Sequence, residues 1–480
     1  MPSSSLRQCG LATRLPDSHH TPMKSFAALL SLASTLLSLH TSHATTAGKP
    51  HILLIIADDM GYADVGFHGC RDIPTPNLDS LARDGIRCSS GYVTGPYCSP
   101  TRAALLTGRA QTRFGHEFNP AGPAAGLPLT ESTLANRLKA SGYHTGLVGK
   151  WHLGASPAHH PLQRGFDEFF GFLGGAHSYT KSTGIQRGTE PVQSIDYSTT
   201  AFGREASSFI SRHSPNPWFL CLAFNAVHTP LEATPEDLTS FATITDPQRR
   251  TYAAMLSSMD AAIGRLRTTL TTTGQADNTL IAFFSDNGGP VMRGVTVNGS
   301  SNSPLRGSKR TTLEGGIRVP FVVTWPAHLK PGVFPHPVVQ TDLHATALAA
   351  AGISPDPAWT LEGTNLLPHF SGTTTTAPHD ALFWRFGDQM AILANGFKLV
   401  RHDTTADGAE TGISPPRLYN LSTDIAESKD LAATHPDKVA ALQSLWDHWN
   451  RSNIAPLWGA DHARPRKPQP NGRRRRPANP

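Results

Sequence analysis

Residues 51–59 read HILLIIADD. The uncharged run at 51–57 is followed directly by two adjacent carboxylates, Asp58 and Asp59. A short, continuous apolar run of this kind is typical of a strand buried on both faces of a parallel sheet. In open sheets of this class, ligands bind beyond the carboxyl ends of the strands. The segment therefore predicts a central strand at residues 51–57, with its two carboxylates at the functional edge of the sheet.

Four more apolar runs follow along the chain. They are Tyr143–Val148, Trp218–Phe224, Thr279–Phe284 and Phe321–Trp325. Helical patterns lie between the runs at 134–138 and 252–270, and another follows the last run at 341–351; each is followed by a glycine that suits a helix end. This alternation predicts an α/β fold in which helices flank a large, mostly parallel sheet.

The pattern changes after about Pro355. Two strand-like segments, Phe383–Phe386 and Met390–Leu393, are separated from a third, Lys398–Arg401, by Asn395-Gly396, which is a hairpin signal. A helix is expected around Val439–Trp449. We therefore expect an α/β domain over residues 45–353 that carries the site, and a smaller C-terminal subdomain over 354–462 built from an antiparallel sheet plus a helix.

The first 44 residues resemble a secretory leader. Met23-Lys24 precedes the apolar run Phe26–Leu39, and small residues at Ser42 and Ala44 suit cleavage after Ala44. Translation from Met23 and an uncleaved anchor are the alternatives. No other stretch reaches the roughly 20 apolar residues that a transmembrane helix needs. We expect an exported protein, periplasmic or secreted, without a transmembrane segment.

The charge is concentrated at the ends of the chain. The formal net charge is +6, yet residues 463–480 carry seven basic residues and no acid, and the leader carries +2, which leaves about −3 on residues 45–462. A basic nucleic-acid-binding body is therefore disfavoured, and no nucleic-acid partner is expected. The Pro- and Arg-rich tail is predicted to be disordered, either as a solubilising end or as a tether for an anionic polymer.

Polar residues follow four of the predicted strands. They are Asp58-Asp59, Lys150-Trp151-His152, Asn225 with His228, and Asp286-Asn287. Any one of these groups alone is ordinary turn chemistry, but together they place acids, an amide, a lysine and histidines on one edge. Carboxylate and amide oxygens are the ligands that Ca²⁺ and Mg²⁺ prefer, so a divalent cation is expected there.

In addition to these four groups of polar residues, the segment CSPTRAALLTGR spans residues 98–109. Pro100 suits the first turn of a helix and Gly108 its end, while Arg102 lies on the same side as Cys98. Cys98 is thus placed at a helix N-terminus, where backbone N–H groups favour anions. The residues by themselves predict a nucleophilic thiol of low pKa, and the alternative is a small buried cysteine.

The segment CSPTR, followed by AALLTGR, resembles the signature of the formylglycine-dependent type I sulfatases of the alkaline phosphatase superfamily. The resemblance extends from about Pro50 to Asn450. Its further motifs are Thr75–Asp79, Gly149–Gly154, His228–Pro230, Leu305–Lys309, Glu314–Pro320 and Leu418–Leu421. It implies an alkaline-phosphatase-like sheet and an export-coupled partner, the formylglycine-generating enzyme, that oxidises Cys98 to formylglycine. The hydrated aldehyde is then the nucleophile.

The resemblance also implies a role for each site residue. The implied ligands of a divalent ion, usually calcium with magnesium as the alternative, are Asp58, Asp59, residue 98, Asp286 and Asn287. The implied catalytic residues are Cys98, Arg102, Lys150, His152, His228 and Lys309. Arg102 and Lys150 would hold the hydrated aldehyde, and His152 would take a proton from it. Lys309 and His228 would contact the sulfate and help the leaving oxygen depart.

This assignment suits the chemistry of a sulfate ester. Charge builds on the sulfate oxygens and on the leaving group during transfer, and a divalent cation with Arg102, Lys150 and Lys309 would stabilise it. One hydroxyl of the hydrated aldehyde attacks sulfur, and loss of a proton from the other re-forms the aldehyde and expels sulfate. A serine or an unmodified cysteine has no second hydroxyl, so it cannot release sulfate by re-forming an aldehyde.

The remaining cysteines and most histidines are expected to be structural. Cys70 and Cys88 are candidates for a disulfide in an oxidising compartment, and Cys221 is expected in the core. The lone histidines expected to be structural are His116, His144, His159, His160 and His177. Pocket-wall candidates are Phe114, His116, His177, Arg293 and Trp384.

The leading hypothesis is an exported sulfatase that removes sulfate from an organic ester, with sulfated carbohydrate or polysaccharide as the expected substrate. The first alternative is a phosphonate or phosphodiester hydrolase of the same superfamily. The second is a non-catalytic protein that binds sulfated glycans, which would require Cys98 to remain a thiol.

Overall fold

A computed structural model describes residues 48–292, 296–410 and 412–459 of the chain. The expectations for the leader at 1–44, for the basic tail at 463–480 and for Arg293 lie outside these residues. Across the described ranges, no helix combines the length and the apolar character needed to cross a membrane.

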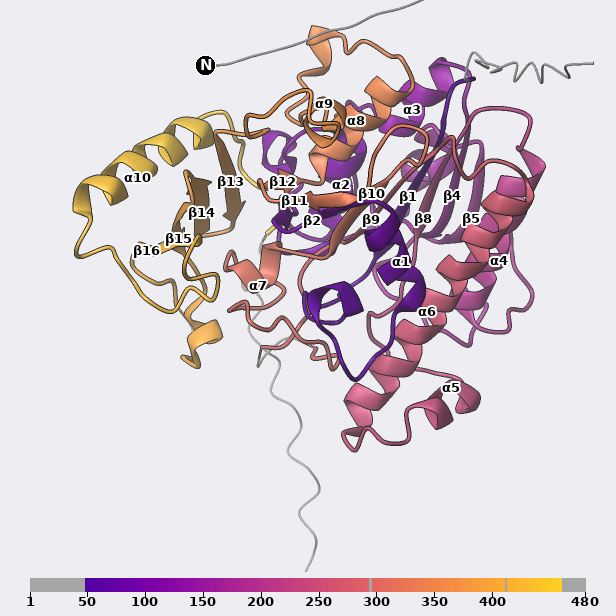
Figure 1. Ribbon diagram of the computed structural model, residues 1–480, viewed down its shortest axis with the longest axis horizontal. Coiled ribbons are helices and arrows are strands. Elements are labelled where there is room, and N and C mark those ends of the chain that lie inside the picture. The colour runs from indigo at the N-terminus through magenta and orange to yellow at the C-terminus, as the bar shows by residue number, and fades with distance from the viewer. Residues whose placement is uncertain (1–47, 293–295, 411, 460–480) are drawn as a thin grey trace, which may run out of the picture. The chain divides into compact units, whose positions relative to one another are not determined.

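The predicted central strand is β1 (His51–Ala57), which lies in the middle of a ten-stranded sheet (Figure 1). It pairs in parallel with β9 (Thr279–Ser285) on one side and with β8 (Trp218–Ala223) on the other. Beyond β8 come β4 (His144–Lys150) and β5 (Glu168–Phe172), also parallel. The predicted mostly parallel sheet is therefore confirmed at its centre.

The outer strands are shorter and mixed in direction. Beyond β9 the order is β10 (Phe321–Thr324), β2 (Ile86–Cys88) and β11 (Gly332–Phe334), and beyond β5 it is β6 (Gln186–Arg187) and β7 (Glu190–Pro191). A small separate pair is β3 (Gly91–Tyr92) with β12 (Val338–Val339). The fifth predicted run, β10, is antiparallel to β9. Among the described residues of the connection between them (286–292 and 296–320), α7 (Glu314–Ile317), a single turn, is the one helix, so no long crossover helix is seen there to return the chain in parallel.

Helices cover both faces of the sheet because β1 is apolar on both sides. Leu53 and Ile55 face one core, together with α1 (Pro76–Asp84), α4 (Ser198–Arg212) and α6 (Pro247–Thr272). Leu54 and Ile56 face the other, together with α2 (Cys98–Thr107), α3 (Leu134–Ala140) and α8 (Thr341–Ala350). The three helical patterns read from the sequence correspond to α3, α6 and α8. The shorter helices α5 (Pro235–Ser240) and α9 (Leu367–Phe370) lie in connections.

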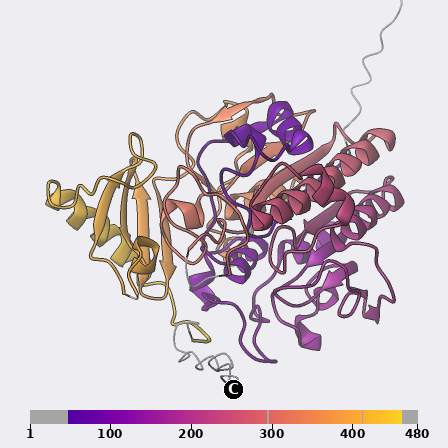
Figure 2. The same cartoon turned by 90° about the horizontal axis from the view of Figure 1, so that it is seen from below.

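The C-terminal part forms the predicted antiparallel sheet with a helix, coloured gold in Figure 2. Its strands, in order, are β13 (Ala381–Phe386), β14 (Gln389–Ala394), β15 (Phe397–Arg401) and β16 (Arg417–Asn420). Asn395 and Gly396 have φ of 50° and 76°, as the predicted hairpin turn requires. Helix α10 (Pro436–Asn450) buries Leu442 against this sheet. Strand β16 is short and was not predicted.

A buried ion cluster connects β15 to the main α/β part. The Lys398 ammonium lies 2.9 Å from Glu314 Oε1 and 2.9 Å from Glu427 Oε1, and all three side chains are buried. Tyr92 donates a hydrogen bond of 2.8 Å to the other Glu314 oxygen. Burial and the neighbouring Glu314 raise the pKa of Glu427 to about 7, although Lys398 opposes the shift. Lys398 therefore supplies one positive charge to two carboxyl groups that are buried away from water.

We expect Lys398→Met to destabilise the protein by about 3–5 kcal/mol, because removing one partner leaves buried charge uncompensated. The measurement is the free energy of unfolding in urea. Lys139→Met is the matched control, since Lys139 pairs with Asp167 at 2.6 Å but is 50% exposed. It should cost about 0–1 kcal/mol. Equal losses for the two variants would contradict the structural role of the cluster.

Candidate active site

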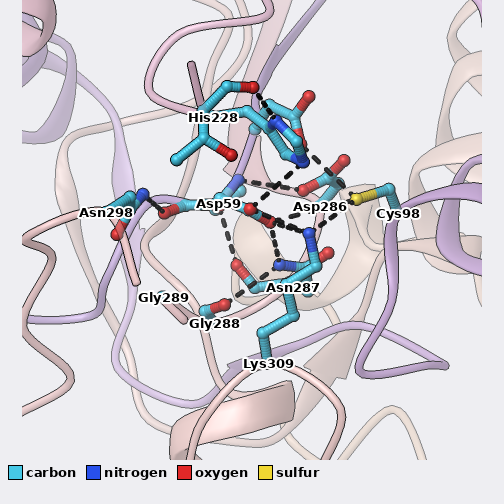
Figure 3. A network of polar contacts seen from close by, with 12 residues as sticks. Asp59, Cys98, His228, Asp286, Asn287, Gly288, Gly289, Asn298 and Lys309 are labelled. Carbon is cyan, nitrogen blue, oxygen red and sulfur yellow. Dashed lines mark hydrogen bonds and ion pairs between the residues drawn. The ribbon is translucent and has the colours of Figure 1, made fainter. Parts of the chain in front are cut away.

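The carboxyl ends of three parallel strands converge on one cluster of polar side chains. Asp58 and Asp59 follow β1, Lys150 ends β4, and Asp286 follows β9. Asp59 N–H donates to Asp286 Oδ1 at 3.3 Å, which joins the two strand ends directly. The predicted carboxylates and Lys150 therefore lie together, and Figure 3 shows Asp59 and Asp286 in this cluster beside Cys98, His228 and Lys309.

Cys98 enters this cluster from the N-terminus of α2. Every residue of that helix is buried, and Gly108 ends it with φ of 73° in the left-handed region. Cys98 Sγ lies 3.5 Å from Asp58 Oδ1, 3.9 Å from Asp59 Oδ1 and 3.2 Å from Lys309 Nζ. The cysteine is therefore in contact with both carboxylates of β1 and with a cation from the long connection after β9.

Each carboxylate of the cluster has its own cation. Lys150 Nζ is 2.6 Å from Asp58, and Lys309 Nζ is 2.6 Å from Asp59. Arg102 binds Asp286 Oδ2 through Nε at 2.9 Å and through a terminal nitrogen at 2.8 Å. All of these groups are buried, so each would be strongly destabilising in its charged form without a partner. The ion pairs offset this desolvation cost.

The pKa values show how closely the negative charges are packed. Burial alone would raise the pKa of Asp58, but Lys150, His228 and Arg102 hold it well below its usual range. For Asp286, burial and the Asp58 charge outweigh Arg102 and raise the pKa to about 6. Burial and the nearby Asp58 charge thus make ionisation of Asp286 harder even though Arg102 binds its carboxylate.

The thiol of Cys98 is not activated in this structure. Burial raises its pKa well above the usual range, and the nearby Lys150 and Lys309 only partly oppose the shift. Asp286 and Asp58 push it in the same direction as burial. The low pKa predicted from the helix N-terminus alone is therefore wrong, because that prediction did not include desolvation or the two acids.

The two predicted histidines differ in the contacts that hold them. His228 Nε2 lies 3.5 Å from Asp59 Oδ2, and its Nδ1 donates to the carbonyl of Thr229 at 2.5 Å. His152 follows β4 with φ of 62°, in the left-handed region that non-glycine residues rarely adopt. Burial, Lys150 and Arg102 lower the pKa of His152 well below its usual range, so its imidazole is neutral near pH 7.

The donor atoms fit a divalent cation. One possible ligand atom from each of Asp58, Asp59, Cys98 and His228 lies within 4.8 Å of the others. Asn287 Oδ1 is buried and lacks a hydrogen-bond donor among the described residues, while its Nδ2 donates to Asp59 at 2.7 Å. An amide oxygen left in this way beside carboxylates matches the oxygen ligands of Ca²⁺ and Mg²⁺. Relative to the predicted ligand set, this group includes His228 and leaves out Asp286, whose Oδ2 is held by Arg102.

A family model described as Sulfatase matches residues 50–353. The chain belongs to the sulfatase family. N-acetylgalactosamine-6-sulfatase of Homo sapiens is 32% identical over 445 residues, covering 82% of this chain and 84% of that protein. Arylsulfatase A of Homo sapiens is 34% identical over 466 residues, covering 86% of this chain and 90% of that protein. The predicted family and enzyme class, a sulfuric ester hydrolase, are confirmed.

Solved structures agree with this assignment. The crystal structure of Ps i-CgsB superposes with a TM-score of 0.80 at 37% identity, covering 85% of this sulfatase and 94% of that chain. Its complex with k-i-k-neocarrahexaose superposes with a TM-score of 0.79. The predicted fold class, a large mostly parallel sheet with a smaller antiparallel sheet, is confirmed.

Sequence reasoning missed two residues that shape the site of this sulfatase. Asn298 donates from Nδ2 to the carbonyls of Asp59 and Val227, at 3.0 Å each, and so supports the left-handed backbone of Asp59. Ser285 accepts from Met60 N–H at 3.0 Å and holds the turn after β1 against β9. The only signal for Asn298 was its place in the Gly-, Ser- and Asn-rich segment 288–316.

Other predicted candidates do not face the cluster. Asn225 bonds to Ser198 and to the carbonyl of His177, and Trp384 donates to the carbonyl of Val93. Phe114 packs in a hydrophobic core. These contacts support the fold.

The described cysteines are all free thiols, so the suggested pairing of Cys70 with Cys88 is wrong. Cys70 lies beside Asp72 and packs against the core on one face of the sheet. Cys88 is buried in the core on the opposite face, as is Cys221. The sheet itself separates the two sulfurs, which the spacing in the sequence does not reveal.

We expect iodoacetamide to leave Cys98 unlabelled in the native protein at mildly alkaline pH, because the thiol is 1% exposed and its pKa is raised. The protein should lack residues 1–44 and be produced without the formylglycine-generating enzyme. After unfolding in urea without reductant, all four remaining cysteines, at 70, 88, 98 and 221, should react. Peptide mass spectrometry reports both results. Two unlabelled cysteines at 70 and 88 after unfolding would contradict the free-thiol assignment.

Proposed function

We propose that this sulfatase hydrolyses sulfate esters of carbohydrates, using Cys98 converted to formylglycine and a divalent cation, Ca²⁺ with Mg²⁺ as the alternative. The observation that carries the proposal is the position of Cys98 Sγ, 3.2 Å from Lys309 Nζ and 3.5 Å from Asp58 Oδ1. A nucleophile at residue 98 would meet the sulfate where the cations of the site converge.

Conversion of Cys98 would solve a problem that the buried thiol presents. A thiol with a raised pKa is a poor nucleophile at neutral pH. The hydrated aldehyde of formylglycine supplies one hydroxyl that attacks sulfur and a second whose loss of a proton re-forms the aldehyde as sulfate leaves. Lys150 and Arg102, buried on the Asp58 and Asp286 side of residue 98, would fix the orientation of the two hydroxyls.

The charge balance supports a sulfate substrate. Without a metal, three carboxylates face three cations, and the cluster is close to neutral. A divalent ion held by Asp58, Asp59, Asn287, Asp286 and residue 98 would give the pocket an excess of positive charge. That excess would stabilise a bound sulfate and the charge that develops on its oxygens.

The least buried side chains of the cluster mark the side from which substrate would enter. The His228 side chain is 17% exposed and that of Lys309 is 8% exposed, whereas Asp58, Lys150 and Asp286 are completely buried. Asp59 and the other carboxylates raise the pKa of Lys309 despite its burial, so its ammonium stays protonated. Lys309 would donate to the leaving oxygen with His228 beside it, and the neutral His152 would accept the proton from the aldehyde hydrate.

Carbohydrate as the substrate class rests on the relatives. Ps i-CgsB has been solved with a carbohydrate, k-i-k-neocarrahexaose, and another relative is named for a sulfated amino sugar. Export to the periplasm or the medium is part of the proposal and rests on the leader sequence. There the enzyme would meet polymers too large to enter a cell, after maturation by the formylglycine-generating enzyme.

We expect calcium to stabilise the wild-type protein and not Asn287→Ala, because the variant lacks the buried amide oxygen that has no donor. Calcium at about 100 times its Kd should add about 2.7 kcal/mol to the free energy of unfolding. The measurement is unfolding with calcium and with chelator. Asn225→Ala is the control, since Asn225 is equally buried but bonds to Ser198 outside the cluster. A calcium effect of equal size in Asn287→Ala and the wild type would contradict the site.

We expect the protein, coexpressed with the formylglycine-generating enzyme, to release free sulfate from at least one sulfated glycan and from an aryl sulfate. Cys98→Ala should show no turnover, and Lys309→Ala should lower kcat by about 10²–10³-fold. The exposed Lys330→Ala is the control and should behave like the wild type. A parallel panel of phosphate esters should remain intact. No sulfate release, with the aldehyde at residue 98 proven by peptide mass, would favour the phosphoryl-transfer alternative.

A further inference from the structure

We propose that Ser99 and His116 are positioning residues that hold His152 beside residue 98. This inference rests on the proposed function, because it assigns a support to the residue that would accept the proton. From the sequence, Ser99 was given no role of its own within the CSPTR segment, and His116 was expected to be structural or to line the pocket.

The contact that carries the inference is a short chain of hydrogen bonds. Ser99 Oγ lies 2.6 Å from His116 Nε2 and 2.6 Å from the backbone carbonyl oxygen of His152. Both Ser99 and His116 are completely buried. Since Ser99 directly follows Cys98 in α2, its hydroxyl links the start of that helix to the segment after β4.

The direction of each bond follows from the chemistry of the groups. A carbonyl oxygen only accepts, so the Ser99 hydroxyl must donate its one hydrogen to His152. His116 Nε2 must then donate to Ser99 Oγ. His116 Nδ1 is buried and lacks a partner within the described part of the chain, so a second proton there would be an unpaired buried charge. Burial also lowers the pKa of His116 to about 3, which agrees with a neutral ring protonated on Nε2.

The support matters for His152 because its backbone and packing, rather than a hydrogen bond at Nδ1, set the direction of the ring. Its Nδ1 is buried without a hydrogen-bond partner among the residues that the structure describes. A Cβ added at Gly175 would lie 2.4 Å from His152 Nε2, so the ring rests directly on that glycine. The backbone of His152 has φ of 62° and is fixed at its two ends, by Leu173 O at 3.1 Å and by Ser99. Loss of the Ser99 bond would therefore release the peptide that aims the imidazole.

The loop that carries His116 is in turn fastened by the last described segment of the chain. The ring of Trp458 packs edge-to-face on His116 at 4.9 Å, and its Nε1 donates to the carbonyl of Phe118 at 2.9 Å. Ile454 N–H donates to Thr112 O at 3.1 Å, and Leu457 N–H donates to Gly115 O at 2.9 Å. Residues 454–458 thus fix the position from which His116 reaches Ser99.

The test compares His116→Phe with His116→Gln in the coexpressed, full-length protein, using 4-nitrophenyl sulfate with calcium. Phenylalanine keeps a ring against Trp458 but has no donor, whereas the glutamine amide keeps an N–H near the position of Nε2. Both changes lie outside residues 98–102, and peptide mass confirms the aldehyde in each protein. A displacement of His152 by about 1 Å should lower kcat by roughly 10–100-fold in His116→Phe, with KM unchanged. His116→Gln should retain kcat within about threefold of the wild type, by the same geometric argument.

A second readout separates positioning from general damage. If His152 is misplaced, nitrophenol release should show a burst of about one equivalent per active site before slow turnover, because sulfate release is then the slow step. Ser99→Ala should show the same burst after its aldehyde content is verified, and it replaces His116→Phe if that variant fails to fold. Ser414→Ala is the matched control, since it removes a buried serine–histidine contact of 3.1 Å to His402 in the C-terminal part.

Two outcomes overturn the inference. One is a kcat for His116→Phe equal to that of the wild type. The other is a loss in which kcat and melting temperature fall together, as in Ser414→Ala, without a burst and without rescue by glutamine. An inactive wild-type protein that carries the aldehyde would instead overturn the proposed function, so the two failures are distinguishable.

Discussion

Three carboxylates buried at the ends of neighbouring strands are the constraint on which the rest of the structure depends. These are Asp58, Asp59 and Asp286, which are fully or almost fully buried. Each needs a cation beside it, because leaving a buried charge unpaired costs about 3–5 kcal/mol. The cations come from three separate places, namely β4, α2 and the long connection after β9. The parallel sheet, the cysteine helix and that connection must therefore assemble together, and the site forms only when the fold is complete.

The same burial decides the chemistry that residue 98 can perform. Desolvation and two nearby acids raise the pKa of the Cys98 thiol, although it lies at a helix N-terminus and in contact with Lys309. A buried, charged pocket that raises the pKa of a thiol would also strengthen each fixed electrostatic interaction with a bound sulfate. Conversion of the cysteine to an aldehyde hydrate is compatible with this environment, because its hydroxyl does not have to exist as a free anion before it attacks.

The C-terminal part supports the site at two points. Lys398 of β15 neutralises Glu314, five residues after Lys309 in the connection that delivers that lysine. Residues 454–458 fasten the loop of His116, which bonds to Ser99 next to residue 98. The first support is a buried ion pair, and the second consists of backbone hydrogen bonds and the ring contact of Trp458 with His116. The smaller sheet and its final segment thus contribute rigidity where a reacting group must be held to a fraction of an ångström.

Local features of the sequence determined the central strands, the main helices and the Asn395-Gly396 hairpin. They also determined the strand-end location of Asp58, Lys150 and Asp286. This was possible because run length, periodicity and turn residues act over a few positions. The family followed from the CSPTR segment. Tertiary structure alone decided that β10 runs antiparallel, that Cys70 and Cys88 lie on opposite faces of the sheet, and that the Cys98 pKa is raised. It also decided that Asn298 and His116 support the site. These properties depend on which distant segments pack together and exclude water. A pattern within one segment carries no information about that packing.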